Sequence, residues 1–323
     1  MDKLLSIAVA AYNVEKYIDI VLSSLTHSKC ISSLDIMVID DGGSDNTMSI
    51  ASKYAEDYPE SIRLIHTENG GHGNVINTGI KNAAGEYFKV VDGDDHVDTE
   101  GLDELLDLIN RHKPDIFLNP YIVFDDESGE KIREKDSCAN VPHDMILSVN
   151  EYHCDLFPEM HSLTVKTKLL REKAVSITRH MFYVDVEYAF KASINANTVY
   201  AGCRPVYCYR VGRSGQSVSP EQLKKNFGHH EHLAYTLLEE IAKTDNGSIK
   251  REWAEEIAAP YIYKQYMICA WQKRISEGRR LSKIVRTKHQ GIYKRIVRKK
   301  LKLIEKTGFL ISYFWKYIDH EPI

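Results

Sequence analysis

Residues 87–95 read YFKVVDGDD, a short strand-forming run that ends in three carboxylates. Three similar runs precede it along the chain, and segments with apolar residues at helical spacing separate the four. Strand–helix alternation at this spacing predicts βαβ units, and therefore a mostly parallel sheet with helices on both faces. The expected strands are residues 4–10, 34–39, 62–65 and 87–91, and the expected helices are residues 14–25, 47–58, 74–83 and 99–111.

Polar, mostly glycine-containing clusters follow each of these four strands. In a parallel α/β sheet, ligands bind beyond the carboxyl ends of the strands. Four such clusters therefore predict one binding site at one edge of the sheet. Each cluster alone also has a simpler interpretation, as a capped helix start or a turn. The clusters lie at residues 11–13, 40–47, 68–74 and 92–96.

The last of these clusters carries three carboxylates, on Asp92, Asp94 and Asp95. Carboxylates this close repel one another unless a cation or hydrogen-bond donors are present. Divalent cations prefer oxygen ligands, and Gly93 allows the backbone to pass close to a ligand. Taken alone, the cluster is equally consistent with a solvated acidic turn before the next helix.

Four segments resemble, in order and spacing, the motifs of family 2 glycosyltransferases, which have the GT-A fold. The resemblance covers residues 4–111 closely, extends more weakly to about residue 219 and is absent beyond. It implies an α/β, Rossmann-like, mostly parallel sheet flanked by helices, with a helical C-terminal appendage. The segments are SIAVAAYNVEKY at 6–17, DDGGSDNT at 40–47, NGGHGNVINTG at 69–79 and GEYFKVVDGDD at 85–95.

The resemblance also implies a UDP-sugar donor and a Mn2+ or Mg2+ cofactor. Asp94 would ligate the metal, which neutralises the departing UDP, and Asp92 would face the ribose or the diphosphate. The expected donor-binding residues are Ala11, Tyr12, Asn13, Asp40, Asn69, Gly71, His72, Asn77, Asp92, Gly93, Asp95 and Arg210, and the expected metal ligands are Asp94 and Asp92.

The chain departs from the family pattern at several positions. Ala10 stands where proline is usual, and Ile76 stands where an arginine often precedes Asn77, so one donor-side cation is missing. His72 is unusual in its loop. It either meets the diphosphate or the sugar, or is a solvated loop histidine.

Inverting transfer needs a general base near the acceptor hydroxyl. Residues 182–187, FYVDVE, resemble the family's segment for this base, with Val184 where glutamate is common. We expect Asp185 to be the base, and Glu187, on a different helix face, is the alternative. Asp185 would otherwise only charge the helix N-terminus. His161 is either an acceptor contact or a packed or solvated histidine.

Arg210 is the expected cation over the diphosphate, because an arginine fork suits phosphate oxygens. A surface salt bridge is its simpler interpretation. The motif QxxRW of processive synthases is absent, which favours one sugar per event. Further strands are expected at residues 115–124, 131–134, 160–168, 198–201 and 205–209, and a helix at residues 184–194.

From residue 220 the pattern is helical, with segments at 221–243, 249–276 and 282–305. Between Arg279 and Lys302 there are many basic residues and no acidic ones, and aromatic residues follow. A basic amphipathic helix of this kind predicts membrane-surface association through residues 279–317. The alternative is a helical appendage that packs on the catalytic domain or in a homo-oligomer. No fold that binds nucleic acid accompanies the charge.

These patterns predict a catalytic domain at residues 1–219, with a nucleotide-sugar half at 1–111 and an acceptor half at 112–219, and a basic helical region at 220–323. The N-terminus has no basic leader, and no apolar run reaches the roughly 18 residues of a membrane span. The expected location is cytoplasmic, and the basic stretch adds the inner face of the cell membrane as the alternative place; the six cysteines are expected to be reduced.

The expected function is inverting, metal-dependent transfer of one sugar from a UDP-sugar to a glycan, lipid-linked or protein-linked acceptor, in surface polysaccharide or glycoconjugate synthesis. The alternative is a catalytically impaired protein that binds sugar nucleotides or serves as a membrane-surface scaffold. The missing arginine at position 76 and Val184 are the two features that support this alternative.

Overall fold

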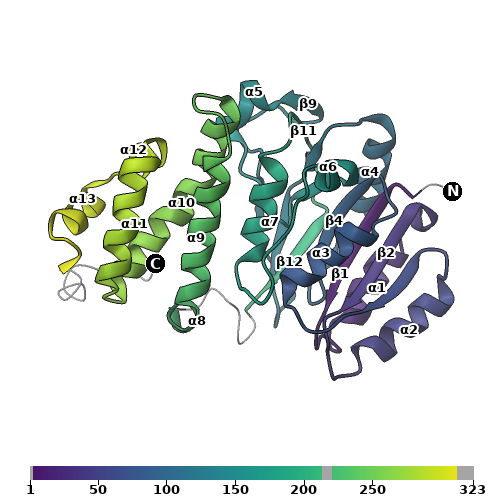
Figure 1. The fold of residues 1–323 in the computed structure, drawn as a ribbon. Coiled ribbons are helices and arrows are strands. Elements are labelled where there is room, and N and C mark those ends of the chain that lie inside the picture. The colour runs from purple at the N-terminus through teal and green to yellow at the C-terminus, as the bar shows by residue number, and fades with distance from the viewer. Residues whose placement is uncertain (1–2, 213–219, 311–323) are drawn as a thin grey trace. The chain divides into compact units, whose positions relative to one another are not determined.

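The computed structural model describes residues 3–212 and 220–310 (Figure 1). The chain divides into two units, residues 1–214 and residues 215–323, and each is described by itself.

An eight-stranded sheet organises the first unit. Its first four strands are parallel to one another in the spatial order β3-β2-β1-β4, so the predicted mostly parallel sheet is confirmed. Beyond β4 the order continues β10-β6-β11-β9, and of these β10 and β9 run antiparallel to their neighbours. The strands are β1 (Leu5–Ala11), β2 (Leu34–Asp40), β3 (Ile62–His66), β4 (Tyr87–Asp92), β6 (Ile116–Leu118), β9 (Met145–Ser148), β10 (Leu163–Lys166) and β11 (Thr198–Ala201).

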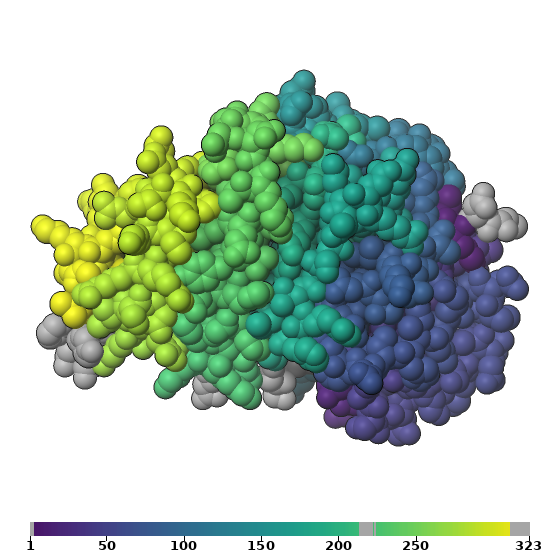
Figure 2. Space-filling model, in the orientation of Figure 1, coloured from purple at the N-terminus to yellow at the C-terminus, as the bar shows by residue number. Residues whose placement is uncertain are grey.

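Helices cover both faces of this sheet (Figure 1). Helix α4 begins where the Asp98 side chain accepts a hydrogen bond from the Gly101 amide, and it buries Leu102, Leu105 and Ile109. Strand β2 is buried along its whole length. The N-terminal residues are also largely covered, since their purple colour shows only in small patches in Figure 2. The helices are α1 (Ile18–Thr26), α2 (Thr47–Asp57), α3 (His72–Asn82), α4 (Thr99–Arg111), α5 (Val149–Tyr152), α6 (Thr167–Glu172) and α7 (Val184–Ser193).

A second, four-stranded sheet has the order β5-β12-β7-β8. The prediction of one strand over residues 115–124 is wrong, because the chain leaves β6 at Pro120 and enters β7 in this other sheet. Proline has no N–H to donate to a continuing ladder. Strands β5 and β9 were not predicted. The strands are β5 (His96–Val97), β7 (Tyr121–Asp125), β8 (Lys131–Lys135) and β12 (Tyr207–Val211).

The described part of the second unit is helical, as predicted, but the helices are shorter. The expected helix at 249–276 ends at Trp271, and Lys273 beyond it has a positive φ of 57°. The expected helix at 282–305 is broken after Lys288 and again after Ile296. Among the residues described, no helix has the length and apolar character to cross a bilayer. The helices are α8 (Pro220–Lys225), α9 (Phe227–Ala242), α10 (Ile249–Trp271), α11 (Ile275–Lys288), α12 (Gln290–Ile296) and α13 (Lys299–Lys306).

Candidate active site

The carboxyl ends of β1, β2, β3 and β4 meet at one edge of the large sheet. In the strand register Ala11 lies beside Asp40, Asp40 beside His66, and Ala10 beside Asp92. Parallel pairing therefore brings together clusters that lie up to about 80 residues apart in the sequence.

The turn after β4 is held by its own backbone. The Asp95 amide donates to the Asp92 carbonyl, and the Gly93 amide donates to the Ala10 carbonyl, each at 3.1 Å. A Cβ on Gly93 would lie 2.4 Å from that carbonyl oxygen. The approach of β1 therefore explains this glycine, while its expected contact with a donor stays a prediction.

Asp95 is only 1% exposed and points back into the protein. Its carboxylate accepts hydrogen bonds from the Tyr207 hydroxyl at 2.6 Å and from the Arg210 amide at 2.7 Å. Burial, together with the charges of Asp92 and Asp94, raises the pKa of Asp95 well above its ordinary value. This carboxylate therefore ties the turn to β12, whereas the Asp94 side chain is half-buried.

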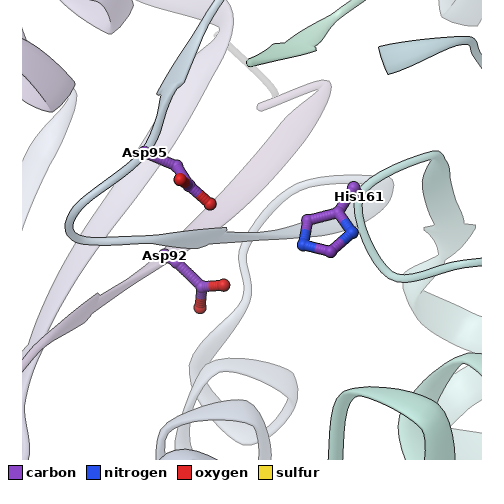
Figure 3. Close-up of side chains that lie close together, drawn as sticks. All are labelled: Asp92, Asp95 and His161. Carbon is purple, nitrogen blue, oxygen red and sulfur yellow. The ribbon is translucent and has the colours of Figure 1, made fainter. Parts of the chain in front are cut away.

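Asp92 lies beside two histidines. Its Oδ1 is 3.0 Å from Nε2 of His72, an ion-pair distance without hydrogen-bond alignment. Ligand atoms of Asp92, Asp95 and His161 lie within 4.8 Å of one another (Figure 3). Burial lowers the pKa of His72, but the carboxylates of Asp92, Asp185 and Asp94 together outweigh it, and the net shift is upward. For His161 burial prevails, and its pKa is lowered.

Asp185 lies in the first turn of α7 and interacts electrostatically with His161, His72 and Asp92. Burial raises its pKa, although the two histidines oppose the shift. Glu187 is instead buried among structural partners, because it accepts hydrogen bonds from Thr178 and from Lys191. Of the two expected base candidates, only Asp185 belongs to the cluster around Asp92.

Asp41 follows Asp40 where the nucleotide base or the ribose could be met, but it is not among the expected donor-binding residues, and it braces the glycine-rich loop. Its carboxylate accepts hydrogen bonds from the Gly70 amide at 3.0 Å, the Gly71 amide at 2.6 Å and the Asn74 side chain at 2.9 Å. Gly71 has a φ of 76°, which favours glycine. Neighbouring side chains at a strand end point to opposite sides of the sheet. The sequence therefore already indicated that Asp40 and Asp41 have different surroundings.

Asn77 exchanges two hydrogen bonds of 2.8 Å with the backbone of Ile177, one donated by each partner. This pairing attaches the chain before α7 to α3. Both ends of the amide are thereby engaged, and we propose a positioning role for Asn77 in place of the expected donor contact.

We expect Gly73→Ala to destabilise the first unit by about 2 kcal/mol or more, as overpacking of a closely packed site does. A Cβ on Gly73 would lie 2.0 Å from the Thr178 carbonyl oxygen, so the backbone has to move. Chemical unfolding followed by circular dichroism measures the loss. The matched control is Gly228→Ala, where the added Cβ meets nothing within 4 Å. Equal stability of the two variants would contradict the prediction.

The residues expected to bind the nucleotide base and the ribose differ in their exposure to solvent. Tyr12 is 50% exposed and available for stacking, whereas Ala11 is fully buried and offers only its backbone. Asp40 accepts a hydrogen bond from the Gly43 amide at 2.8 Å. Asn13 has a φ of 53° and accepts from the Ser44 amide at 2.8 Å. Asn69 is exposed.

Arg210 is 7% exposed and already engaged. Its guanidinium donates to the Asp94 carbonyl at 2.6 Å and to the Asp126 carboxylate at 2.9 Å. It also lies between the rings of Tyr17 and Phe124, at 4.7 and 4.6 Å from their centroids. Arg210 therefore supports the turn after β4, and its expected contact with the diphosphate stays a prediction. Residues 213–217, RSGQS, resemble a family segment whose arginine and serine side chains can close over the diphosphate, and they lie outside the described residues.

Lys89 is a charged residue in the middle of β4 that was not singled out from the sequence. It is fully buried, and its Nζ donates to the carbonyls of His161 at 2.9 Å and Leu163 at 3.3 Å. Burial lowers its pKa from 10.5 to about 7. A lysine inside an otherwise apolar strand was the signal available in the sequence.

We expect Lys89→Met to change how stability depends on pH. Between about pH 7 and 10.5 the unfolded lysine keeps its proton while the folded one releases it, so Lys89 makes wild-type stability rise with pH by up to about 1.4 kcal/mol per unit. The variant lacks this contribution. Urea unfolding at several pH values in metal-free buffer measures the free energy of unfolding of both proteins. A difference in this free energy that stays constant with pH would contradict the prediction.

We compared the chain with known protein families, curated proteins and solved structures. The model of glycosyl transferase family 2 matches residues 6–180. The chain belongs to this family. A curated relative, the poly(ribitol-phosphate) beta-N-acetylglucosaminyltransferase TarS of Staphylococcus aureus, is 26% identical over 216 residues, which are 66% of this chain and 36% of the relative. The glycosyltransferase EpsJ of Bacillus subtilis is 39% identical over 36% of this chain and 33% of its own length.

The chain thus spans about a third of the length of these family 2 relatives. Among solved structures, residues 1–349 of TarS in complex with UDP-GlcNAc match with a TM-score of 0.70 and 18% identity, over 96% of this chain and 89% of that one. A mannosyltransferase from Pyrobaculum calidifontis in complex with GDP-Man and Mn2+ matches with a TM-score of 0.59 and 14% identity, over 100% of this chain and 89% of that chain. The GT-A fold expected from the sequence is confirmed.

Proposed function

We propose that this protein is an inverting, metal-dependent glycosyltransferase that transfers one sugar from a UDP-sugar. The observation that carries the proposal is that Asp185, a half-buried carboxylate in the first turn of α7 with a raised pKa, interacts electrostatically with Asp92 at the end of β4. A base candidate and a metal-side carboxylate thus share one site. Family membership and the nucleotide-sugar complexes of the two structural neighbours support the choice of donor.

In this proposal Asp92 and Asp94 hold a divalent cation, because carboxylate oxygens are the ligands that Mn2+ and Mg2+ prefer. When bound, the metal supplies charge neutralisation for the departing diphosphate. Asp185 accepts the proton of the acceptor hydroxyl, and its raised pKa makes it a stronger base. Tyr12, Asn13, Asp40, Asn69 and Gly71 line the expected nucleotide side of the site.

The acceptor in this proposal is a glycan or glycoconjugate of surface polysaccharide synthesis. The names of the relatives support this choice, and the missing QxxRW motif supports transfer of a single sugar. The test is donor hydrolysis and transfer across a panel of UDP-sugars and GDP-mannose, with Mn2+ and with EDTA. We expect turnover of one UDP-sugar that EDTA abolishes. Donor binding without turnover would favour the catalytically impaired alternative, and full activity in EDTA would refute metal dependence.

We also propose that the second unit binds anionic membrane surface, which would place the protein at the inner face of the cell membrane. Arg279, Lys283 and Arg286 follow one another at i, i+4 and i+7 along α11. They line a hollow of about 450 Å³ together with Gly308 and Phe309. Anionic lipid attracts a basic face of this kind. Residues 311–317 of the expected region lie outside the described residues.

Flotation with vesicles of phosphatidylglycerol tests this surface. We expect the double variant Lys283→Glu/Arg286→Glu to lose flotation and Lys243→Glu, in the same unit, to keep it. Unchanged flotation of the double variant would contradict the membrane proposal. The alternative role of these helices, packing in a homo-oligomer, would then show as a concentration-dependent mass in sedimentation.

A further inference from the structure

His161 is held rigidly at the amino end of β10. Its ring lies among three tyrosines, with centroid distances of 5.1 Å to Tyr121, 4.9 Å to Tyr207 and 4.4 Å to Tyr209. Its carbonyl accepts a hydrogen bond from the buried ammonium of Lys89 at 2.9 Å. A ring held from several sides presents its nitrogens in fixed directions, as a preorganised ligand requires.

Two carboxylates share the space in front of this ring. Figure 3 shows the side chains of Asp92, Asp95 and His161 reaching toward one another, and one ligand atom from each lies within 4.8 Å of the others. Nδ1 of His161 is buried and has no hydrogen-bond partner in the described structure. A buried polar atom without a partner costs about 1–3 kcal/mol, so it points to a ligand that is bound there during function.

The three side chains do not have equal capacity for a ligand. Both oxygens of Asp95 already accept hydrogen bonds, from the Tyr207 hydroxyl and the Arg210 amide. Asp92 keeps about a quarter of its side chain exposed. Asp92 and His161 are partly exposed, whereas Asp95 is buried, so the first two are the ligands of the proposal below.

We propose that His161 is a nitrogen ligand of the divalent cation, forming with Asp92 a mixed nitrogen and oxygen site. The inference rests on the proposed metal dependence of this site. Mg2+ favours oxygen ligands alone, whereas imidazole suits transition metals. The proposal therefore adds that His161 makes the site prefer Mn2+ or Co2+ over Mg2+.

The test is the binding of Mn2+ to the full chain in the presence of UDP, followed by isothermal titration and by electron spin-echo spectroscopy, which detects a coordinated imidazole nitrogen. We expect a nitrogen coupling in the wild type that disappears in His161→Asn. We also expect about a 10-fold or greater loss of Mn2+ affinity in that variant, with Mg2+ affinity nearly unchanged. Thermal unfolding checks that the variant is folded.

The matched control is His72→Asn, since His72 is the other histidine beside Asp92. Loss of the coupling in His72→Asn, but not in His161→Asn, would overturn the proposal. Mn2+ binding without any nitrogen coupling in the wild type would overturn it even if His161→Asn fails to fold, and would leave metal dependence intact. Failure of the wild type to bind Mn2+ at all would refute both the inference and the proposed metal dependence.

Discussion

Replacing Asp185 with asparagine is expected to lower kcat about 10³-fold, within the range that general base catalysis contributes. The substitution removes the proton acceptor and keeps the size of the side chain. Donor affinity and thermal stability should stay close to wild type, because the half-buried carboxylate has a raised pKa and its charge is not a source of stability. Steady-state transfer kinetics, with donor binding measured separately, give the two values.

Glu187→Gln is the control for this experiment. It should chiefly lower stability, because Glu187 accepts hydrogen bonds from Thr178 and Lys191 while buried. If Asp185→Asn kept its rate while a folded Glu187→Gln lost it, the base would have to be reassigned. The pH profile adds a second check. The acid limb of kcat/KM should lie above the ordinary range of an aspartate, because the base must be deprotonated and burial raises the pKa of Asp185.

Asp94→Ala is expected to remove the stimulation of transfer by metal, a loss of about 10²–10³-fold. A bound metal contributes several kcal/mol to transition-state stabilisation, and each 1.36 kcal/mol is tenfold in rate. The Asp94 side chain is half-buried, whereas its carbonyl accepts the hydrogen bond from Arg210, which the substitution leaves in place. Stability should therefore change little. Activity titrated with Mn2+ and thermal unfolding test both statements.

Asp95→Ala is the comparison that separates a metal ligand from a support. It would take the buried acceptor away from the Tyr207 hydroxyl and the Arg210 amide, and an unsatisfied buried group costs about 1–3 kcal/mol. We expect a loss of stability that exceeds that of Asp94→Ala. Full activity of Asp94→Ala would show that the metal assignment is wrong.

The fold of the first unit was predictable where local pattern decides structure. The four parallel strands were found within one or two residues, because apolar runs and helical segments alternate regularly from Leu5 to Arg111. The prediction failed where tertiary context decides. Residues 115–124 look like one strand, yet Pro120 divides them between two sheets. The breaks near Lys273 and His289 depend on helix packing that apolar spacing does not encode.

By itself, the sequence determined the α/β alternation, the family, and the set of strand-end clusters from which any site here is made. Those features follow from local spacing and from short motifs. Only the tertiary structure decided how the roles divide. It directed Asp95 toward Tyr207 and β12, engaged Glu187 with Thr178 and Lys191, and brought His161, from the turn before β10, to Asp92. The physical reason is that burial and hydrogen-bond partners distinguish one carboxylate from another, and both are set by distant segments that fold against the site.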